Sequence, residues 1–148
     1  MSEHRATLTW SRNGAEFTYK TYSRAHRWDF GHGHVVEASA APEFLGEESL
    51  VDPEQAFVAS LASCHALTFL AICALQKLTV EGYTDEAVGF LEKGEDGKPW
   101  LARAELRPQV VFAEGVEVDA DKLADLHEKS HHECFLANSV KTEIVTVL

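Results

Sequence analysis

Two stretches of the sequence hold the residues most capable of chemistry. The segment ASLASCHALTF places Cys64 beside His65, and the segment HEKSHHECFLANSVK places Cys134 three residues after His131. A pair of thiols can carry out redox chemistry, whereas clustered histidine, cysteine and glutamate side chains can bind a metal ion. The two stretches therefore indicate either a thiol site or a metal site.

The metal interpretation rests on five residues, His127-Glu128-Lys129-Ser130-His131, which match the H-E-x-x-H pattern of zinc hydrolases. Histidines four positions apart lie on one face of a helix, and the glutamate between them could act as a general base. Such a site needs a third ligand, and the pattern arises readily by chance in a chain rich in His and Glu. A metal-binding or metallohydrolase domain using His127, Glu128 and His131 stays open as an alternative.

The thiol interpretation needs two properties of Cys64 and Cys134. The attacking cysteine must exist partly as thiolate, and a second thiol must lie close enough to convert its sulfenic acid into a disulfide. Arg24 and Arg27 are candidates for stabilising the thiolate, and Glu54 is a candidate for holding the guanidinium in place. These residue types make a thiol site possible without deciding for it.

The clearest helix begins at Asp52, a plausible N-cap, followed by Pro53. From position 55 to 76 the sequence has 22 residues with no Asp, Glu, Lys or Arg. A membrane span is disfavoured, because polar side chains are dispersed through the segment and no basic flank precedes it. We expect this helix to be buried on all sides by a sheet and a second subunit. Cys73, in its apolar part, is expected to be an unreactive core residue.

The remaining elements predict an α+β fold. Alternating residues on both sides of Asn13-Gly14 predict a hairpin, and residues 24–38 predict a further strand interrupted by a Gly-rich turn. Residues 83–115 predict two strands with a turn at 95–97, residues 119–134 an amphipathic helix capped by Asp119, and residues 139–148 a final strand. The order of strands, long helix, strands, helix and strand predicts an antiparallel sheet packed with helices.

Composition narrows the class of protein. The chain has 148 residues and a net charge of −11, which predicts a single domain over 1–148 that binds neither nucleic acid nor an anionic membrane surface. Three cysteines and a polar N-terminal segment, MSEHRATLTW, do not suggest a secreted disulfide framework. We therefore expect the cytoplasm as its location.

Two motifs resemble those of the OsmC/Ohr family, the osmotically inducible and organic-hydroperoxide-resistance proteins. The first is VDPEQAFVASLASC, which ends at Cys64, and the second is HHECFLANSVK, which contains Cys134 70 positions later. The order of predicted elements agrees with this family along essentially the whole chain. The sequence is most similar to a subgroup with YSR, DPE and SCH segments.

The resemblance implies an intertwined homodimer in which antiparallel sheets wrap the long cysteine-bearing helices. It implies a thiol peroxidase that needs no cofactor and reduces organic hydroperoxides or hydrogen peroxide. A non-catalytic OsmC-like dimer, structural or ligand-binding, stays open as an alternative. In this interpretation Cys64 attacks the peroxide, Cys134 closes a disulfide with it, and Glu54 holds an activating arginine. A small hydroperoxide and a dithiol reductant are the implied partners, besides a second copy of the chain.

Two points depart from the family pattern. The family arginine often lies in a Gly-rich context, which is not found here; the match is the segment YSRAHRW, where Arg24 is favoured over Arg27. His26 and His65 are not the usual family residues, and their roles stay open.

Glu54 and Cys64 are ten residues apart on one helix, which separates them by about 15 Å along its axis. We therefore predict that Cys64 and Cys134 come from one subunit and that Arg24 and Glu54 come from the other.

Overall fold

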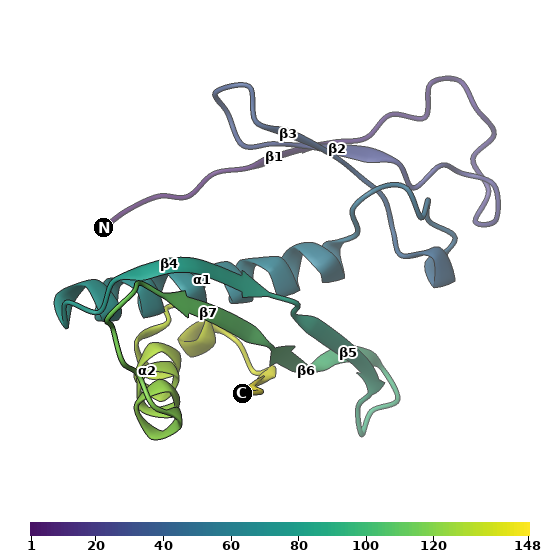
Figure 1. The fold of residues 1–148 in the computed structure, drawn as a ribbon. Coiled ribbons are helices and arrows are strands. Elements are labelled where there is room, and N and C mark those ends of the chain that lie inside the picture. The colour runs from purple at the N-terminus through teal and green to yellow at the C-terminus, as the bar shows by residue number, and fades with distance from the viewer. The chain divides into compact units, whose positions relative to one another are not determined.

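The computed structural model describes residues 1–148 and contains eight β-strands, two α-helices and two short 3-10 helices (Figure 1). The chain forms two compact units, Met1–Ala56 and Phe57–Leu148. Compactness alone does not make a unit an independent domain, so the single domain over 1–148 stays a prediction. The order of strands, long helix, strands, helix and strand confirms the predicted α+β class.

The first unit is built on a three-stranded antiparallel sheet. Strands β1 (Thr7–Thr9), β2 (His26–Asp29) and β3 (Val35–Ala38) pair in chain order, and a short 3-10 helix, η1 (Pro42–Phe44), follows. The turn between β2 and β3 has positive φ at three successive positions, 31–33, two of which are glycines. The Gly-rich interruption predicted in residues 24–38 is therefore present, with a strand on each side.

The hairpin predicted around Asn13-Gly14 is wrong beyond its turn. Both turn residues have positive φ (51° and 76°), as such a turn requires, but no strand follows, and β1 pairs with β2 instead. The Trp10 Nε1–H donates to the Ser23 carbonyl at 2.8 Å, and its ring packs against Phe17. The aromatic side chains form a local cluster here rather than cross-strand pairs.

Helix α1 (Pro53–Leu75) begins where the sequence predicts. Asp52 accepts the Gln55 N–H at 2.7 Å, and the Gln55 side chain accepts the Asp52 N–H at 3.1 Å, which is a capping box. One stripe of the helix at a spacing of three to four residues is buried: Val58, Leu61, His65, Phe69 and Cys73.

The opposite face of α1 lies open. Leu67 is 66% exposed and Leu75 is 84% exposed. By length and composition alone the helix is apolar enough to cross a membrane, and only 28% of its most apolar part is buried within one chain. The burial on all sides that the sequence predicts is therefore not supplied by a single chain.

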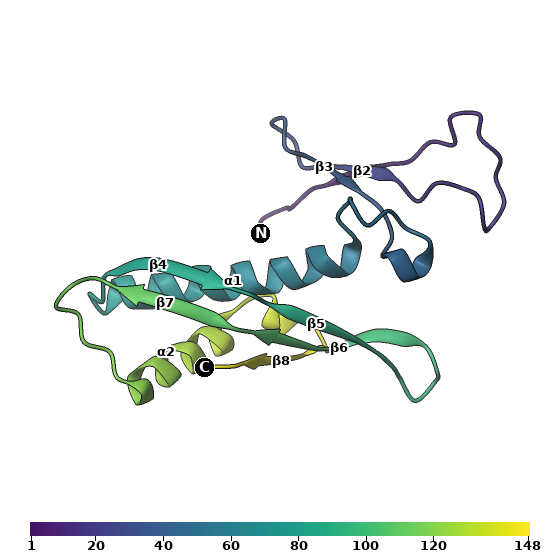
Figure 2. The ribbon, with the colours of Figure 1, turned by 45° about the vertical axis from the view of Figure 1, so that its right-hand side comes forward.

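The second unit contains two sheets (Figure 2). Strands β4 (Val80–Asp85) and β7 (Pro108–Phe112) form an antiparallel pair, while β5 (Val88–Lys93) pairs antiparallel with β6 (Pro99–Leu106). The last strand, β8 (Glu143–Thr146), lies parallel to β6. The ladders are therefore antiparallel, as predicted, with this one exception.

Residues 83–115 form four strand segments instead of the predicted two. The predicted turn is present, with Gly97 at φ 76° and its N–H bonded to the Gly94 carbonyl at 2.8 Å. Further breaks occur at Glu86-Ala87 and at Arg107, whose N–H donates to Asp85 Oδ1 at 2.7 Å. Each predicted strand is therefore divided between two sheets, because the chain turns at these points.

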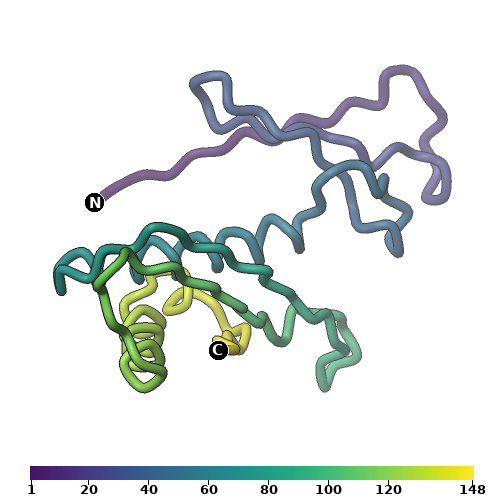
Figure 3. Tube along the Cα trace, in the orientation of Figure 1, coloured from purple at the N-terminus to yellow at the C-terminus, as the bar shows by residue number.

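Helix α2 (Ala120–Glu133) is capped by Asp119, which accepts the Lys122 N–H at 2.8 Å as the sequence predicts. The chain then passes through a short 3-10 helix, η2 (Ala137–Ser139), before β8 (Figure 3). Phe69 and Cys73 of α1 and Leu126 of α2 form the apolar core. Its partly buried neighbours come from α1, α2, the β4–β7 sheet and the adjoining loops: Ile72, Leu78, Val80, Tyr83, Val110, Phe112, Val118 and Leu123.

Glycine at position 89 permits the close approach of α1 to β5. A Cβ atom built on Gly89 would lie 2.5 Å from Val58 Cγ2 and 3.2 Å from Leu101 Cδ2. The first distance is well inside the normal contact range of carbon atoms. Helix α1 is therefore seated on this strand only because position 89 has no side chain.

Candidate thiol site

The structure brings Cys64 and Cys134 together. Cys64 lies in the middle of α1, and Cys134 is the residue that ends α2, so the contact joins two elements far apart in sequence. The two thiols lie near enough for Cys64 to raise the pKa of Cys134, and both are free. The chain therefore positions two cysteines for disulfide formation.

The two thiols have different surroundings. Cys134 is only 2% exposed, whereas Cys64 is partly exposed. Burial raises the pKa of Cys134, and the neighbouring Cys64 thiol raises it further, while the backbone N–H groups of Ala137 and Leu136 oppose the shift. Cys134 is thus held as a protonated thiol, and Cys64 is the sulfur that a solute can reach.

Cys73 lies apart from this pair. It is 1% exposed in the apolar core beside Phe69 and Leu126, and burial raises its pKa. A thiol in such surroundings behaves as a small hydrophobic side chain. Its placement agrees with the expectation that Cys73 is a core residue.

A buried pair of histidines joins the same two helices, and one of them, His65, directly follows Cys64. His65 Nε2 and His127 Nδ1 are 2.9 Å apart and share a hydrogen bond, and the rings are stacked 5.2 Å between centroids. The Phe69 ring stacks on His127 at 4.3 Å. Burial lowers the pKa of both histidines to about 4, and neighbouring histidines, His127 first, add to the effect at His65.

The sequence carries a signal for this histidine pair, although the pair was not among the predictions. His65 occupies a core position on the apolar stripe of α1, and His127 follows the core residue Leu126 on α2. A buried histidine needs a hydrogen-bond partner, so one on each of two packed helices indicates a pair.

The H-E-x-x-H residues do not form a metal site. His127 is bonded to His65, Glu128 is exposed, and His131 lies one helical turn further along α2. The structure contains no group of three or more His, Cys, Asp or Glu side chains placed to hold a metal ion. The geometry therefore favours the thiol interpretation of this segment.

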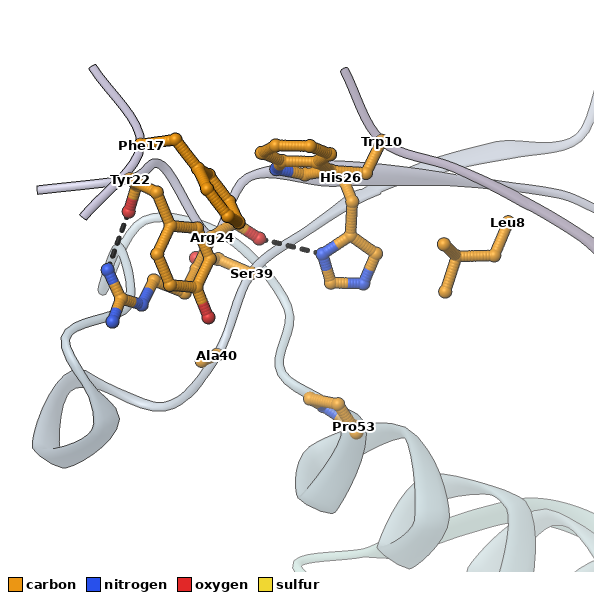
Figure 4. Close-up of a pocket in the computed structure, with 9 residues that line it drawn as sticks. All are labelled: Leu8, Trp10, Phe17, Tyr22, Arg24, His26, Ser39, Ala40 and Pro53. Carbon is orange, nitrogen blue, oxygen red and sulfur yellow. Dashed lines mark hydrogen bonds between the residues drawn. The ribbon is translucent and has the colours of Figure 1, made fainter. Parts of the chain in front are cut away.

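Arg24 lies in the first unit, where it borders a pocket of about 430 Å³ (Figure 4). Its guanidinium donates to the Tyr22 carbonyl at 2.6 Å and to the Tyr19 carbonyl, and lies 3.7 Å from the centroid of the Tyr22 ring. The His26 Nδ1–H donates to the Arg24 carbonyl at 2.7 Å. The pocket is mainly apolar and aromatic, with Leu8, Trp10, Phe17, Ser39, Ala40 and Pro53 completing its lining.

The other two tuning candidates differ from Arg24. Arg27 forms an exposed ion pair with Glu37 on the β2–β3 sheet, with 2.9 Å between Nη2 and Oε1. Glu54 forms no salt bridge within the chain, and its Oε2 is buried without a hydrogen-bond partner. Arg24 and Glu54 therefore form no ion pair with each other within one chain, and Glu54 Oε2 can still accept a hydrogen bond.

The family assignment follows from comparison with known proteins. The model of the OsmC-like protein family matches residues 46–148, which include both cysteines of the thiol pair. The chain belongs to the OsmC-like family. This confirms the resemblance drawn from the two cysteine motifs, whereas the subgroup is a prediction still.

Solved structures support the assignment of this OsmC-like protein. An OsmC-like protein of unknown function from Vibrio cholerae has 49% sequence identity and a TM-score of 0.94, with 99% of each chain covered. An organic hydroperoxide resistance protein from Elizabethkingia anophelis has 20% identity, a TM-score of 0.75 and coverage of 99% of this chain and 93% of its own.

The organic hydroperoxide resistance protein OhrB of Bacillus subtilis has 17% identity and a TM-score of 0.67, with coverage of 99% of this chain and 98% of its own. At such low identities these two proteins show a common fold. None of the curated proteins compared with this OsmC-like protein matches it.

Proposed function

We propose that this OsmC-like protein is a thiol peroxidase that reduces organic hydroperoxides. The Cys64 thiolate attacks the hydroperoxide, an S–O bond forms, the O–O bond breaks, and the alkoxide takes up a proton and leaves as an alcohol. Cys134 then attacks the sulfenic sulfur, an S–S bond forms, and the S–O bond breaks with loss of water. A small cytoplasmic dithiol reduces the disulfide and is itself oxidised to a disulfide.

The observation that carries this proposal is the contact between a partly exposed and a buried thiol. The exposed thiol is accessible to peroxide, and the buried thiol is accessible only to the oxidised form of its neighbour. The two relatives described as organic hydroperoxide resistance proteins supply the choice of substrate. The Vibrio cholerae relative, described as of unknown function, adds nothing to that choice.

Intact mass after one equivalent of cumene hydroperoxide tests the cycle. We expect the wild type to lose two hydrogens and to give a Cys64–Cys134 cross-link on peptide mapping. The Cys134→Ser variant should gain one oxygen on Cys64, and Cys73→Ala should behave as the wild type. Unmodified thiols in the wild type, or oxidation spread over all three cysteines, would contradict the proposal.

We further propose that the complete site is made by two subunits. The open apolar face of α1 is suited to cover the same face of a second copy, because exposed leucines gain free energy on burial. Glu54 has an unpartnered buried oxygen, and Arg24 borders an apolar pocket suited to the organic part of a hydroperoxide. In this arrangement Arg24 and Glu54 of one subunit serve Cys64 of the other.

Subunit mixing tests this arrangement. Arg24→Gln should lower the peroxidase rate by about 10²-fold through loss of a charged group that stabilises the thiolate. Arg27→Gln should leave the rate nearly unchanged, because Arg27 is paired with Glu37. Refolding inactive Cys64→Ser with inactive Arg24→Gln should restore about a quarter of the wild-type activity, since half of the dimers then hold one complete site. No recovery from a confirmed heterodimer would place all four residues in one subunit.

A further inference from the structure

The His65–His127 hydrogen bond is the buried side-chain hydrogen bond between α1 and α2, and an exposed bond joins Lys122 of α2 to Gln76, just after α1. Both residues are almost completely buried, at 1% and 2% exposure. A buried polar bond between two helices fixes their relative position more narrowly than apolar packing does, because displacement leaves both groups unsatisfied. The pair therefore determines how α2 lies against α1.

The position of this bond connects it to the thiols. His65 follows Cys64 on α1, and His127 precedes Cys134 by seven residues on α2. Seven residues are about two helical turns, so His127 and Cys134 lie on the same face of α2. The histidine bond and the thiol contact thus join the same two elements, at neighbouring positions of α1 and about 10 Å apart along α2.

We propose that His65 and His127 are positioning residues that hold Cys134 against Cys64 for disulfide closure, an inference that rests on the proposed peroxidase cycle. Both rings are almost completely buried whereas Cys64 is partly exposed, so a peroxide can reach Cys64 without contacting them. Disulfide closure does need the two histidines, because a disulfide forms only when the two Cα atoms lie within about 7 Å. The pair acts on the second step of the cycle and leaves the first step alone.

Protonation supplies a way to break this bond without a mutation. The bond needs one ring nitrogen with a proton and one without, so a further proton on the pair removes the acceptor. The low pKa of both histidines, about 4, shows that the buried pair stays neutral until the solution is acidic. His131 of α2 adds repulsion, while Tyr83 of β4, with Asp85 beside it, faces His127.

Substitutions at position 127 can separate the bond from the space that the ring fills. Asparagine and leucine have the same branching, but only the amide of asparagine places a polar atom where His127 has Nδ1. His127→Leu should slow disulfide closure roughly tenfold or more while Cys64 sulfenate forms within twofold of the wild-type rate. His127→Asn should close within about threefold of the wild type, which is the rescue that a purely steric role does not predict.

The rate of disulfide closure at acid pH, the acid limb of its pH profile, gives a second measurement. Closure in the wild type should slow as the pH falls toward 4, beyond the slowing caused by protonation of the thiols. The double variant His65→Gln/His127→Asn retains both cysteines but has no imidazole in the pair, so it should lack this additional acid limb. If His127→Leu unfolds, the pH profile of the double variant decides, because an unchanged acid limb there would overturn the inference.

Closure by diamide separates this inference from the proposed function, because diamide oxidises a thiol pair without peroxide. If peroxide gives no sulfenate in the wild type, the peroxidase proposal fails, and the order of diamide closure rates, wild type, then His127→Asn, then His127→Leu, still tests the pair. Equal closure rates in His127→Leu and wild type would overturn the inference. Equal slowing of sulfenate formation and closure would overturn it as well.

Discussion

Cys64 and Cys73 lie nine residues apart on the same helix, and the structure gives them opposite surroundings. Cys64 lies near Cys134, and the next residue, His65, belongs to a hydrogen-bonded histidine pair, whereas Cys73 packs in the apolar core beside Phe69 and Leu126. We call the part of α1 that holds Cys64 and His65 the polar layer and the part that holds Phe69 and Cys73 the apolar layer. The comparison shows that the packing partners, and not the residue type, decide which thiol is available for chemistry.

The largest expected effect comes from substituting one cysteine at a time. Cys64→Ser should lower peroxidase turnover by at least about 10³-fold, because a hydroxyl cannot form the sulfenic acid. Cys73→Ala should leave turnover within twofold, since its thiol has no reacting partner. Steady-state assays with an organic hydroperoxide and a dithiol measure both. A large loss of turnover in a folded Cys73→Ala protein would end the contrast between the two layers.

Acid should distinguish the two layers by their stability. Free histidines bind protons below pH 6.5, while His65 and His127 in the fold do so only near 4. The unfolded chain therefore gains protons first as the pH falls, so the free energy of unfolding should decrease between pH 6.5 and 4 by on the order of 3 kcal/mol per histidine. This contribution is fully present above pH 6.5 and lost below 4.

Urea titrations at several pH values measure this loss. The His65→Gln/His127→Asn variant should show a shallower decrease than the wild type over the same range, because its amides do not titrate. A core variant whose side chain does not stack on the histidines, such as Leu106→Val in β6, should lower stability equally at each pH. An identical pH dependence in the double variant and the wild type would assign the acid sensitivity to other groups.

The smallest expected effect lies in the apolar layer. Cys73→Ser places a hydroxyl among Phe69 and Leu126, where it loses its hydration and can donate only within its own helical turn, and should cost about 1 kcal/mol of unfolding free energy relative to Cys73→Ala. Thermal unfolding of the two variants measures the difference. Equal stability of the serine and alanine variants would mean that this layer tolerates polar groups, and the two layers would then differ less than the structure indicates.

Local signals predicted the helices well. Asp52 and Asp119 cap α1 and α2 where the sequence places them, because a cap depends on residues within one turn. The strands were predicted less well, because the pairing of a strand depends on partners far away in sequence. The expected hairpin failed because residues 7–9 pair with β2, and the strands of residues 83–115 were divided by turns that the alternating pattern does not mark.

The site was predictable to a similar degree. The motif resemblance named Cys64 and Cys134, and the structure places them in contact. The histidine pair was not predicted, because its partners lie 62 residues apart and only the packing of α2 on α1 joins them. His127 also belongs to the H-E-x-x-H pattern, which predicts a role shared with its sequence neighbours and not with His65.

Gly89 has a consequence for how substitution data on this protein should be interpreted. Any side chain there collides with Val58, so a saturation screen for peroxide resistance would record position 89 as intolerant. The screen would rank this glycine beside the cysteines, although it has no group that reacts. Measuring abundance together with resistance would separate them, since Gly89 variants should lose the protein itself while Cys64 variants should lose only its activity.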